Sequence, residues 1–565
     1  MEKRRFSLGQ LLIERKIITQ SQLDEALEEQ KKTGELLGAT LLRMGFIKEE
    51  TVFLPLLAGQ FEVDHINLNE IEIPDNVIRQ VPAKIASHYK IIPFGFEEGT
   101  LLVATNHPLD VHMLDEISLV VKSPMRTALA SEKDIAEAIR KYYGVGAETI
   151  EKMMDSVSSD SQERSSVDHI DELGSDASIS KFLNQILLEA YQNRATDVHI
   201  EPFEDELSIR YRVDGILHDA NVPPNIKHFK DAINARIKIL SNLNIAEKRM
   251  PQDGKFKVRV NDVDIDLRVS FLPTPYGESV VLRVLSSTTL FSLEDLGLPE
   301  EALDLLQGLI KKPHGIIFLT GPTGSGKTTT LYSCLHSINT ENVKIITIED
   351  PIEYQLKGIT QIQINPKVGL TFAQGLRSML RHDPDIMMVG EVRDIETAEI
   401  ATQVALTGHL VFSTLHTNDA ATGIARLLDM GVEPYLITST VECLIAQRLV
   451  RVLCPSCKQR ISRDDEVLKD FYNQVKNNPL ADIYEAKGCE ECQLTGYIGR
   501  EAIYEFLVFN EEIRQLIMSR ETANIIKDAA LRQGMKTLYQ AGWEKVAEGI
   551  TSPQEVLRVT QEEAE

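Results

Sequence analysis

Residues 315–328 read Gly315-Ile316-Ile317-Phe318-Leu319-Thr320-Gly321-Pro322-Thr323-Gly324-Ser325-Gly326-Lys327-Thr328. The last eight match the pattern G-x-x-x-x-G-K-[ST], and the apolar run before them is typical of a buried strand. Glycines let backbone N–H groups converge on phosphate oxygens, and the N-terminus of a following helix adds a positive dipole. The sequence therefore predicts a nucleoside triphosphate site in which a strand enters a phosphate-binding turn and a helix begins near Lys327.

Each polar residue of this turn has an expected role. Lys327 is expected to reach the β- and γ-phosphates, and the hydroxyl of Thr328 to hold Mg²⁺. A glycine turn that only looks like a phosphate loop is the alternative, but it does not explain why the strand, the lysine and the threonine occur together. The expected nucleotide-binding residues are Gly321, Pro322, Thr323, Gly324, Ser325, Gly326, Lys327 and Thr328.

The bulk composition excludes several classes of protein. The chain has 565 residues and a formal net charge of −25. We expect about three or four domains, because one hydrophobic core does not extend over such a length. The acidic balance argues against a nucleic-acid partner, since phosphate neutralisation needs an excess of basic residues. With no long apolar stretch and no signal peptide, we predict a cytoplasmic protein that meets a membrane only through partners.

Four of the six cysteines form two C-x-x-C pairs, Cys454 with Cys457 and Cys489 with Cys492. In a cytosolic protein such pairs favour a structural zinc site over disulfides. Four thiolates give a closed tetrahedral shell with no open position for catalysis. The alternative is a set of metal-free packing cysteines. The spacer between the pairs is long, and we expect it to carry a helix.

The first 145 residues contain an internal repeat. Leu8-Gly9 and the apolar residues after it recur 29 positions later, from Leu37-Gly38 onward. Each unit has the spacing of two short amphipathic helices. A strand is predicted over 99–105 and a helix over 132–143. Residues 146–176 then read as an acidic, serine-rich linker, because the segment 156–166 has little apolar surface to bury.

The rest of the chain predicts a multidomain α/β protein. Residues 177–287 fit a small α/β domain with a strand at 207–213, one face of which bears Arg210 and Arg212. Residues 288–565 fit a RecA-like ATPase domain with parallel strands near 315–320, 344–349, 386–390 and 409–415. This domain would include a zinc subdomain at about 451–500 and a helical tail.

Two acids and a histidine follow the predicted strands. Glu349 ends the strand at 344–349, Glu391 follows the strand at 386–390, and His416 follows the third strand. Alone, a glutamate after a strand is more often a helix cap or a solvated loop residue, and His409, at the start of the third strand, is more often a structural histidine. Together, Glu349, Glu391 and His416 would lie at the same sheet edge as the phosphate loop. Phosphoanhydride hydrolysis needs such a group, because acids hold the metal and polarise the attacking water.

Several strings resemble the secretion ATPases that power type II secretion and type IV pilus assembly. They cover about 177–565 and comprise Arg249-Met-Pro-Gln-Asp253-Gly254, Arg268 to Glu278, the phosphate loop, Thr347 to Tyr354, Arg381 to Thr397, Thr407 to Asn418 and both cysteine pairs. The cysteines and the long N-terminal region resemble the assembly or secretion branch. The string Glu-Asp-Pro-Ile-Glu-Tyr at 349–354 is closer to the type II motor than to the pilus motor.

The resemblance implies an ATP hydrolase that works as a homohexamer with ATP, Mg²⁺ and Zn²⁺. Glu391 would complete the magnesium shell with Thr328, Glu349 would polarise the water, and His416 would sense the γ-phosphate. The alternative is the reverse assignment, in which Glu349 holds the metal and Glu391 polarises the water. Arginines of the small domain would lie over the phosphates, for which Arg210, Arg268 and Arg283 stand in the matching strings. A solvated sheet face is the alternative for these arginines.

The implied machine leaves alternatives open. Type II secretion is favoured over type IV pilus extension, with partners in an inner-membrane platform and the motor peripheral to that membrane. A RecA-like nucleic-acid translocase and a nucleotide-gated subunit without turnover are the other classes. The N-terminal repeat resembles a module that binds cyclic diguanylate, but Ser7 and Leu36 replace its arginines and Lys16 a glycine. These departures favour docking to the platform over dinucleotide binding.

Overall fold

The structure is a computed structural model of the whole chain. The residues that it describes are 8–33, 37–47, 54–55, 58, 63–97, 99–106, 117–118, 121, 123–160, 171–260, 263–285, 292–461, 482–489 and 491–560. The chain divides into two compact units, of which the first ends at Leu285 and the second begins at Ser286. The boundary predicted between the small domain (177–287) and the ATPase domain (288–565) lies outside the described residues. Among those described, no helix is both long and apolar enough to cross a membrane.

The N-terminal repeat is visible in the backbone of the first unit. It begins with α1 (Leu8–Glu14), α2 (Gln20–Thr33) and α3 (Leu37–Arg43). Lys16 and Gly45 stand 29 positions apart and both have left-handed backbone, with φ of 59° and 73°. The turn between the two helices is therefore built in the same way in both units, although Lys16 is not a glycine. Most of the second helix expected in the second unit, around 48–58, lies outside the described residues.

A small four-stranded sheet follows, with the order β1-β4-β3-β2. The strand predicted over 99–105 is β3, and the helix predicted over 132–143 is α8. Ser131 caps α8 by accepting a hydrogen bond from the amide of Asp134. The elements are β1 (Asp64–His65), η2 (Leu68–Glu70), α5 (Asp75–Ile78), α6 (Ala83–Tyr89), β2 (Ile91–Glu97), β3 (Thr100–Thr105), β4 (Met125–Leu129) and α8 (Glu132–Tyr143).

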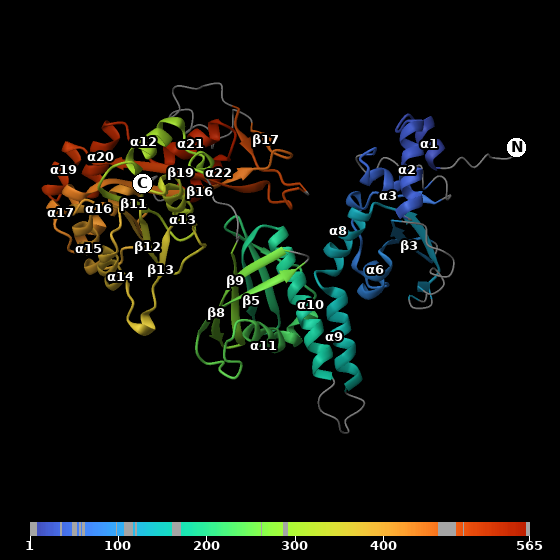
Figure 1. The fold of residues 1–565 in the computed structure, drawn as a ribbon. Helices are drawn as coiled ribbons and strands as arrows, with labels where there is room; N and C mark the ends of the chain where they lie inside the picture. The colour runs from blue at the N-terminus through green and yellow to red at the C-terminus, as the bar shows by residue number, and fades with distance from the viewer. Residues whose placement is uncertain are drawn as a thin grey trace. The chain divides into compact units, whose positions relative to one another are not determined.

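The predicted linker is largely helical. Residues 147–160 form α9 (Ala147–Asp160), which lies beside α10 (Asp171–Gln192) in Figure 1. Ile150 and Met153 of α9 are buried in one cluster with Phe182 of α10. Two apolar residues at helical spacing are enough to dock α9, and the serine-rich composition after them hides this signal. Residues 161–170 lie outside the described residues.

The rest of the first unit is a six-stranded antiparallel sheet with the order β7-β6-β5-β10-β9-β8. Side chains alternate along its strands, so one face packs on α10 and α11 and the other carries charged residues. Its elements are β5 (Ala195–Pro202), β6 (Leu207–Val213), β7 (Ile216–Asp219), η3 (Pro224–Phe229), α11 (Lys230–Leu240), β8 (Gln252–Val260), β9 (Val263–Thr274) and β10 (Gly277–Leu285).

The second unit is built on a seven-stranded sheet with the order β13-β12-β14-β15-β11-β16-β19. All neighbours pair in parallel except β16 and β19. The four predicted strands are confirmed as β11, β12, β14 and β15, and all their residues are buried. The strands are β11 (Gly315–Thr320), β12 (Ile345–Glu349), β13 (Thr360–Gln363), β14 (Ile386–Val389), β15 (Leu410–Leu415), β16 (Val441–Leu453) and β19 (Tyr497–Val508).

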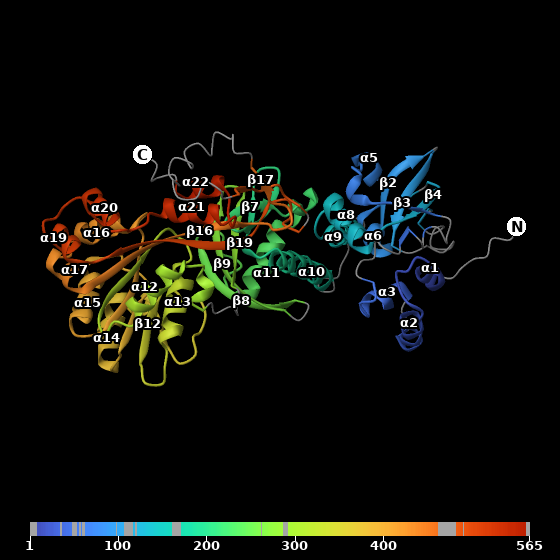
Figure 2. The same cartoon turned by 90° about the horizontal axis from the view of Figure 1, so that it is seen from above.

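Helices cover both faces of this sheet, which is why its strands read as continuous apolar runs. Helices α16, α19 and α20 lie together at one end of the unit in both views (Figures 1 and 2). The helices are η4 (Glu294–Leu296), α12 (Glu300–Ile310), α13 (Lys327–Ile338), η5 (Pro366–Val368), α14 (Phe372–Met379), η6 (Leu380–His382), α15 (Ile395–Leu406), α16 (Ala420–Asp429), α17 (Pro434–Thr440), α19 (Glu511–Met518), α20 (Ala523–Arg532), α21 (Leu538–Ala547) and α22 (Pro553–Thr560).

A buried ion cluster fastens the last helix to the sheet. The carboxylate of Glu555 in α22 is fully buried and accepts hydrogen bonds from Arg451 of β16 at 2.8 and 3.0 Å. Arg558 donates two more, at 2.6 and 2.9 Å, and the Arg451 guanidinium stacks 3.9 Å from the ring centre of Tyr497. Burial opposes ionisation, but the hydrogen bonds from Arg558 and Arg451 outweigh it and keep the pKa of Glu555 below its usual 4.5.

Glu555→Gln should destabilise the packing of α22 on β16 by about 3 kcal/mol, because the largely buried guanidinium group of Arg451 loses its counter-charge. The folded-state pKa is depressed, so the contribution of Glu555 is present above pH 4.5 and is lost as the pH falls through the lower folded value. Hydrogen exchange at β16 and α22 measures the loss. Glu512→Gln, which removes an exposed partner of Arg532, is the control. Equal exchange in the two variants at pH 7 would contradict this account.

Candidate functional site

The phosphate loop has the predicted strand, turn and helix. It follows β11 directly, and α13 begins at Lys327. Gly321, Gly324 and Gly326 all have positive φ, at 147°, 82° and 88°. A Cβ on Gly321 would lie 2.6 Å from the backbone oxygen of Gln447, so the loop passes too close to β16 for any other residue.

The lysine of the loop lies folded against its own backbone. The Nζ of Lys327 donates hydrogen bonds to the carbonyl oxygens of Gly321 at 2.6 Å and Pro322 at 3.0 Å. Burial, and after it the charge of Arg448, lower the pKa of Lys327 to about 8 against the opposing effect of the Glu391 carboxylate. The cation must exchange these carbonyls for phosphate oxygens when an anion binds.

The groups around the turn fit the phosphates of a nucleotide. The Oγ of Ser325 is buried without a hydrogen-bond partner, and Gly324 faces open space. Thr328, at the start of α13, is exposed. A phosphate would give Ser325 an acceptor and Lys327 a counter-charge, and the hydroxyl of Thr328 remains accessible to a magnesium ion.

Glu391 and His416 meet at the carboxyl edge of the sheet. Their strands, β14 and β15, are neighbours in parallel register. The His416 Nε2 lies 3.2 Å from one carboxylate oxygen of Glu391, and Arg393 forms an ion pair with the other. β15 also pairs with β11, so His416 stands one strand and Glu391 two strands from the phosphate loop, at the edge that the strand pattern predicts.

Glu349 ends β12 at the same edge but is enclosed. Only 3% of the residue is exposed. Its carboxylate accepts hydrogen bonds from the hydroxyls of Tyr332 and Thr347, and from the amide of Gln361 at 3.2 Å. Both oxygens are therefore occupied by neutral donors, and Glu349 ties β12 to α13, which carries Tyr332. In this arrangement the carboxylate has no access to a water molecule at the phosphates.

Sequence reasoning missed Glu353 as a candidate. It lies four residues after Glu349 in the same acidic string, is half-buried, and donates its amide to the Tyr332 hydroxyl at 3.4 Å. The signal was present, because the string holds two glutamates. Strand periodicity drew attention only to the one at the strand end.

His409 lies at the other end of β15. Its Nδ1 is 3.0 Å from the carbonyl of Val404 and 3.1 Å from the hydroxyl of Thr407. Its backbone oxygen accepts from the amide of Gly315, the first residue of β11. It thus stands at the amino edge of the sheet, opposite the phosphate loop, with a structural role in the turn before β15.

In the first unit, the predicted arginines share the charged face of the six-stranded sheet. Arg268 and Arg283 are directly opposed across β9 and β10. The Nε of Arg283 donates to Asp197 on β5 at 2.9 Å, and Arg210 pairs with Glu201 on the same strand. β5 therefore supplies a carboxylate to each of these two arginines.

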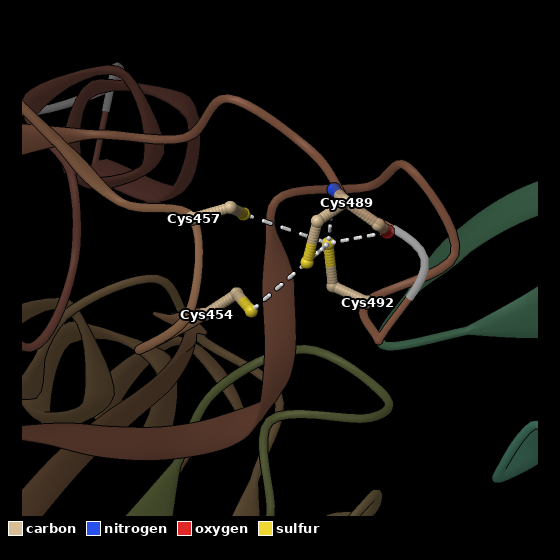
Figure 3. A group of neighbouring side chains, drawn as sticks. All are labelled: Cys454, Cys457, Cys489 and Cys492. Carbon is tan, nitrogen blue, oxygen red and sulfur yellow. Dashed lines mark hydrogen bonds between the residues drawn. The ribbon is translucent and has the colours of Figure 1, made fainter. Parts of the chain in front are cut away.

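The four predicted cysteines converge. Figure 3 shows their sulfur atoms pointing toward one another from two loops. The Sγ atoms of Cys454 and Cys489 are 3.8 Å apart, and Cys492 lies 3.7 Å from both Cys457 and Cys489. Zn–S bonds of about 2.3 Å in a tetrahedron place sulfurs about 3.8 Å apart, so the group fits zinc.

The environment of one sulfur in this cluster favours a thiolate. The backbone amides of Cys489 and Gly496 each donate to the Cys492 sulfur at 3.1 Å. Burial opposes ionisation there, but these amide hydrogen bonds outweigh it and lower the pKa of Cys492 to about 7, whereas burial raises the pKa of Cys454 and of Cys457. Cys334 and Cys443 are fully buried elsewhere in the core. The helix expected between the cysteine pairs falls largely on 462–481, outside the described residues.

Comparisons with known proteins give consistent matches. Residues 172–558 match the family model described as Type II/IV secretion system protein, and residues 61–149 match the MshEN domain. The chain is 39% identical to the type IV pilus assembly ATPase PilB of Myxococcus xanthus, across 97% of this chain and 98% of the relative. It is 41% identical to the type II secretion system protein E of Xanthomonas campestris, across 98% of both chains.

Among solved structures, the ATPase DotB of Yersinia pseudotuberculosis is similar in fold. The TM-score is 0.50 at 21% identity, across 68% of this chain and 94% of that chain. This likeness supports the α/β fold with its P-loop core.

ADP binding to the full-length chain should weaken as the pH rises through about 8, because Lys327 loses its proton near that value in the free protein. Calorimetric titration with ADP between pH 6.5 and 9.5 measures the effect. Lys312→Arg, on a lysine paired with Glu442, is the control and should keep the same profile. An affinity that does not vary across this range would contradict the assignment of the lysine.

Proposed function

Because this chain belongs to the Type II/IV secretion system protein family, we propose that it hydrolyses ATP to drive pseudopilus assembly in type II secretion. The observation that carries the proposal is the phosphate loop with Glu391 and His416 beside it at one sheet edge. Enzymes of this kind need a phosphate cradle, a metal-holding acid and a group that responds to the transferred phosphoryl. These three parts stand on adjacent strands.

We propose the following roles for the residues at this edge. Lys327 leaves the carbonyls of its own loop and binds phosphate oxygens. Thr328 and Glu391 would hold Mg²⁺, which supplies charge neutralisation on the phosphates when bound. His416 would sense the γ-phosphate through its contact with Glu391, and Arg393 would keep the second oxygen of Glu391 oriented.

For the carboxylate that polarises the attacking water, the geometry favours Glu353 over Glu349. The oxygens of Glu349 are occupied and the residue is 3% exposed. A general base must reach its proton within hydrogen-bond distance, directly or through one water. Glu353 belongs to the same loop and is more accessible. We therefore give Glu349 the role of fixing β12 against α13, in place of the catalytic role expected from the sequence.

Arginines of the charged face would complete the site. A transferred phosphoryl needs added positive charge, and guanidinium groups supply it in two-pronged hydrogen bonds. We propose Arg210, Arg268 and Arg283 for this task. The pairs with Glu201 and Asp197 would hold Arg210 and Arg283 extended until a phosphate competes for them.

The pilus machine is the second candidate. The relative named type IV pilus assembly ATPase PilB is nearly as similar as the type II protein, at 39% against 41%. The Glu-Asp-Pro-Ile-Glu-Tyr string at 349–354 supports the secretion machine. In either case we propose a homohexamer, peripheral at the cytoplasmic side of the inner membrane through platform partners. The N-terminal repeat would dock to the platform, with cyclic diguanylate binding as the alternative.

The domain division is also proposed. Residues 1–145 would dock and regulate, 177–287 would present the arginines, and 288–565 would hydrolyse ATP. The segment 146–176 would join the first two through the packed helix α9. The four cysteines would hold zinc as a structural centre, because a closed set of four sulfurs leaves no position for a substrate.

Glu353→Gln should lower ATP turnover by about a hundredfold or more with little change in ADP affinity, because it removes only the base. Glu349→Gln keeps the shape of the side chain but replaces one accepting oxygen by an amide nitrogen that donates, and it should lower turnover less. Lys327→Ala should abolish turnover and serves as the background. Phosphate release by the assembled full-length protein measures all three. A parent protein with no more phosphate release than Lys327→Ala would refute the proposed ATPase. Full activity in Glu353→Gln would return the role to Glu349.

One zinc ion per chain is expected at the cysteine cluster. Plasma emission analysis of purified full-length protein gives the metal content directly. Cys457→Ser should lose most of the zinc, since three sulfurs bind it far more weakly than four. Cys334→Ser, at a buried cysteine outside the cluster, is the control. A parent zinc content well below one per chain, unaltered in Cys457→Ser, would remove the assignment.

A further inference from the structure

Arg448 on β16 lies beside the phosphate loop and belongs to none of the roles above. Its Nη2 donates to the backbone oxygen of Asn418 at 2.9 Å, and to the side-chain oxygen of the same residue at 3.4 Å. Asn418 follows His416 by two residues, in the loop between β15 and α16. The arginine therefore holds the segment that carries the proposed γ-phosphate sensor.

The sheet register places this contact across the end of β11, where the phosphate loop begins. Thr320, the last residue of β11, is level with Leu415 on one side and Ala446 on the other. Arg448 lies on β16, two residues beyond Ala446. Asn418 lies three residues beyond Leu415, in the loop that follows β15. Flanking strands are about 10 Å apart, a span that only a long side chain crosses. The guanidinium thus bridges β16 and the β15 loop over the end of β11.

The residue before Arg448 is in direct contact with the loop itself. Gln447 is 1% exposed, and its side-chain oxygen accepts from the hydroxyl of Thr330 in α13 at 3.0 Å. Its backbone oxygen lies against Gly321, and its side-chain nitrogen is 2.8 Å from where a Cβ on Gly326 would stand. A shift of the phosphate loop must therefore move residues 447 and 448 together.

From these contacts we propose that Arg448 is a positioning residue that couples the phosphate loop to the loop carrying His416. The proposal rests on the proposed ATP hydrolysis. Phosphate entering the loop displaces Lys327 and presses on Gln447, and the Arg448 bridge passes that change to Asn418 and hence to the His416 contact with Glu391. The bridge also keeps a second positive charge near Lys327.

The test uses the full-length assembled protein with Arg448→Gln, Arg448→Lys and the control Arg532→Gln, which alters an exposed pair with Glu512. Unfolding temperature and hexamer content establish that each variant is folded. In Arg448→Gln the affinity for ADP should stay close to that of the parent, because the bridge acts on the loop of His416, the proposed sensor of the γ-phosphate that ADP lacks. ATP turnover should fall about tenfold, the effect of losing one charged hydrogen bond.

Arg448→Lys keeps the positive charge but not the two-pronged contact with Asn418. Its single ammonium lacks the planar fork of arginine, so turnover should fall nearly as far as in Arg448→Gln. With His416→Ala added, Arg448→Gln should cause little further loss of turnover, because both changes break one path.

Turnover of Arg448→Gln within twofold of the parent would overturn the proposal, as would additive losses with His416→Ala. A tenfold loss of turnover with an equal loss of ADP affinity would reduce Arg448 to a structural contact and would also overturn it. If the parent itself releases no phosphate, the proposed ATPase fails, and equal hydrogen exchange over residues 416–419 in the parent and Arg448→Gln would then refute the bridge on its own.

Discussion

Parallel pairing of buried strands is the constraint on which the second unit depends. Because β14, β15 and β11 run in the same direction, the residues that follow them emerge at one edge. That geometry alone brings Glu391 within 3.2 Å of His416 and sets both beside the phosphate loop. Without it, the same residues would be isolated loop polar groups with no shared chemistry.

The same pairing explains which parts of the site are readable from the sequence. The phosphate loop, Glu391 and His416 each follow a continuous apolar run, and such runs predict buried parallel strands. The two C-x-x-C pairs predict their own convergence, since a metal centre needs four sulfurs in one place. In these cases local pattern and tertiary placement agree.

Other features depend on contacts that no local pattern contains. The bridge from Arg448 requires that β15 and β16 flank β11, a strand order set by the crossover connections. The enclosure of Glu349 requires Tyr332 from α13 and Gln361 from β13. The docking of α9 depends on two apolar residues within a serine-rich segment. The sequence shows where each strand ends, but it does not show which other strands lie beside it.

The strands β16 and β19 link the cysteine cluster to the residues beside the phosphate loop. β16 runs for 13 residues from beside β11 to Leu453, immediately before Cys454, and β19 returns antiparallel to it from Tyr497, shortly after Cys492. The cysteine cluster is thus mounted on the ribbon that also bears Gln447 and Arg448. The buried Glu555 holds the far end of this ribbon through Arg451. The cysteine cluster and the residues that contact the phosphate loop therefore lie on one pair of strands.

The central proposal is that ATP turnover at the sheet edge of the second unit needs Arg268 and Arg283 of the charged face of the first. ATP turnover and ADP affinity of the assembled full-length protein, in Arg268→Ala and Arg283→Ala, test it most directly. Arg259→Ala, at an exposed arginine paired with Asp264 in the same sheet, is the control. The account predicts at least about a tenfold loss of turnover with ADP affinity retained. Turnover within a factor of two of the parent in both variants, with the hexamer intact, would contradict it.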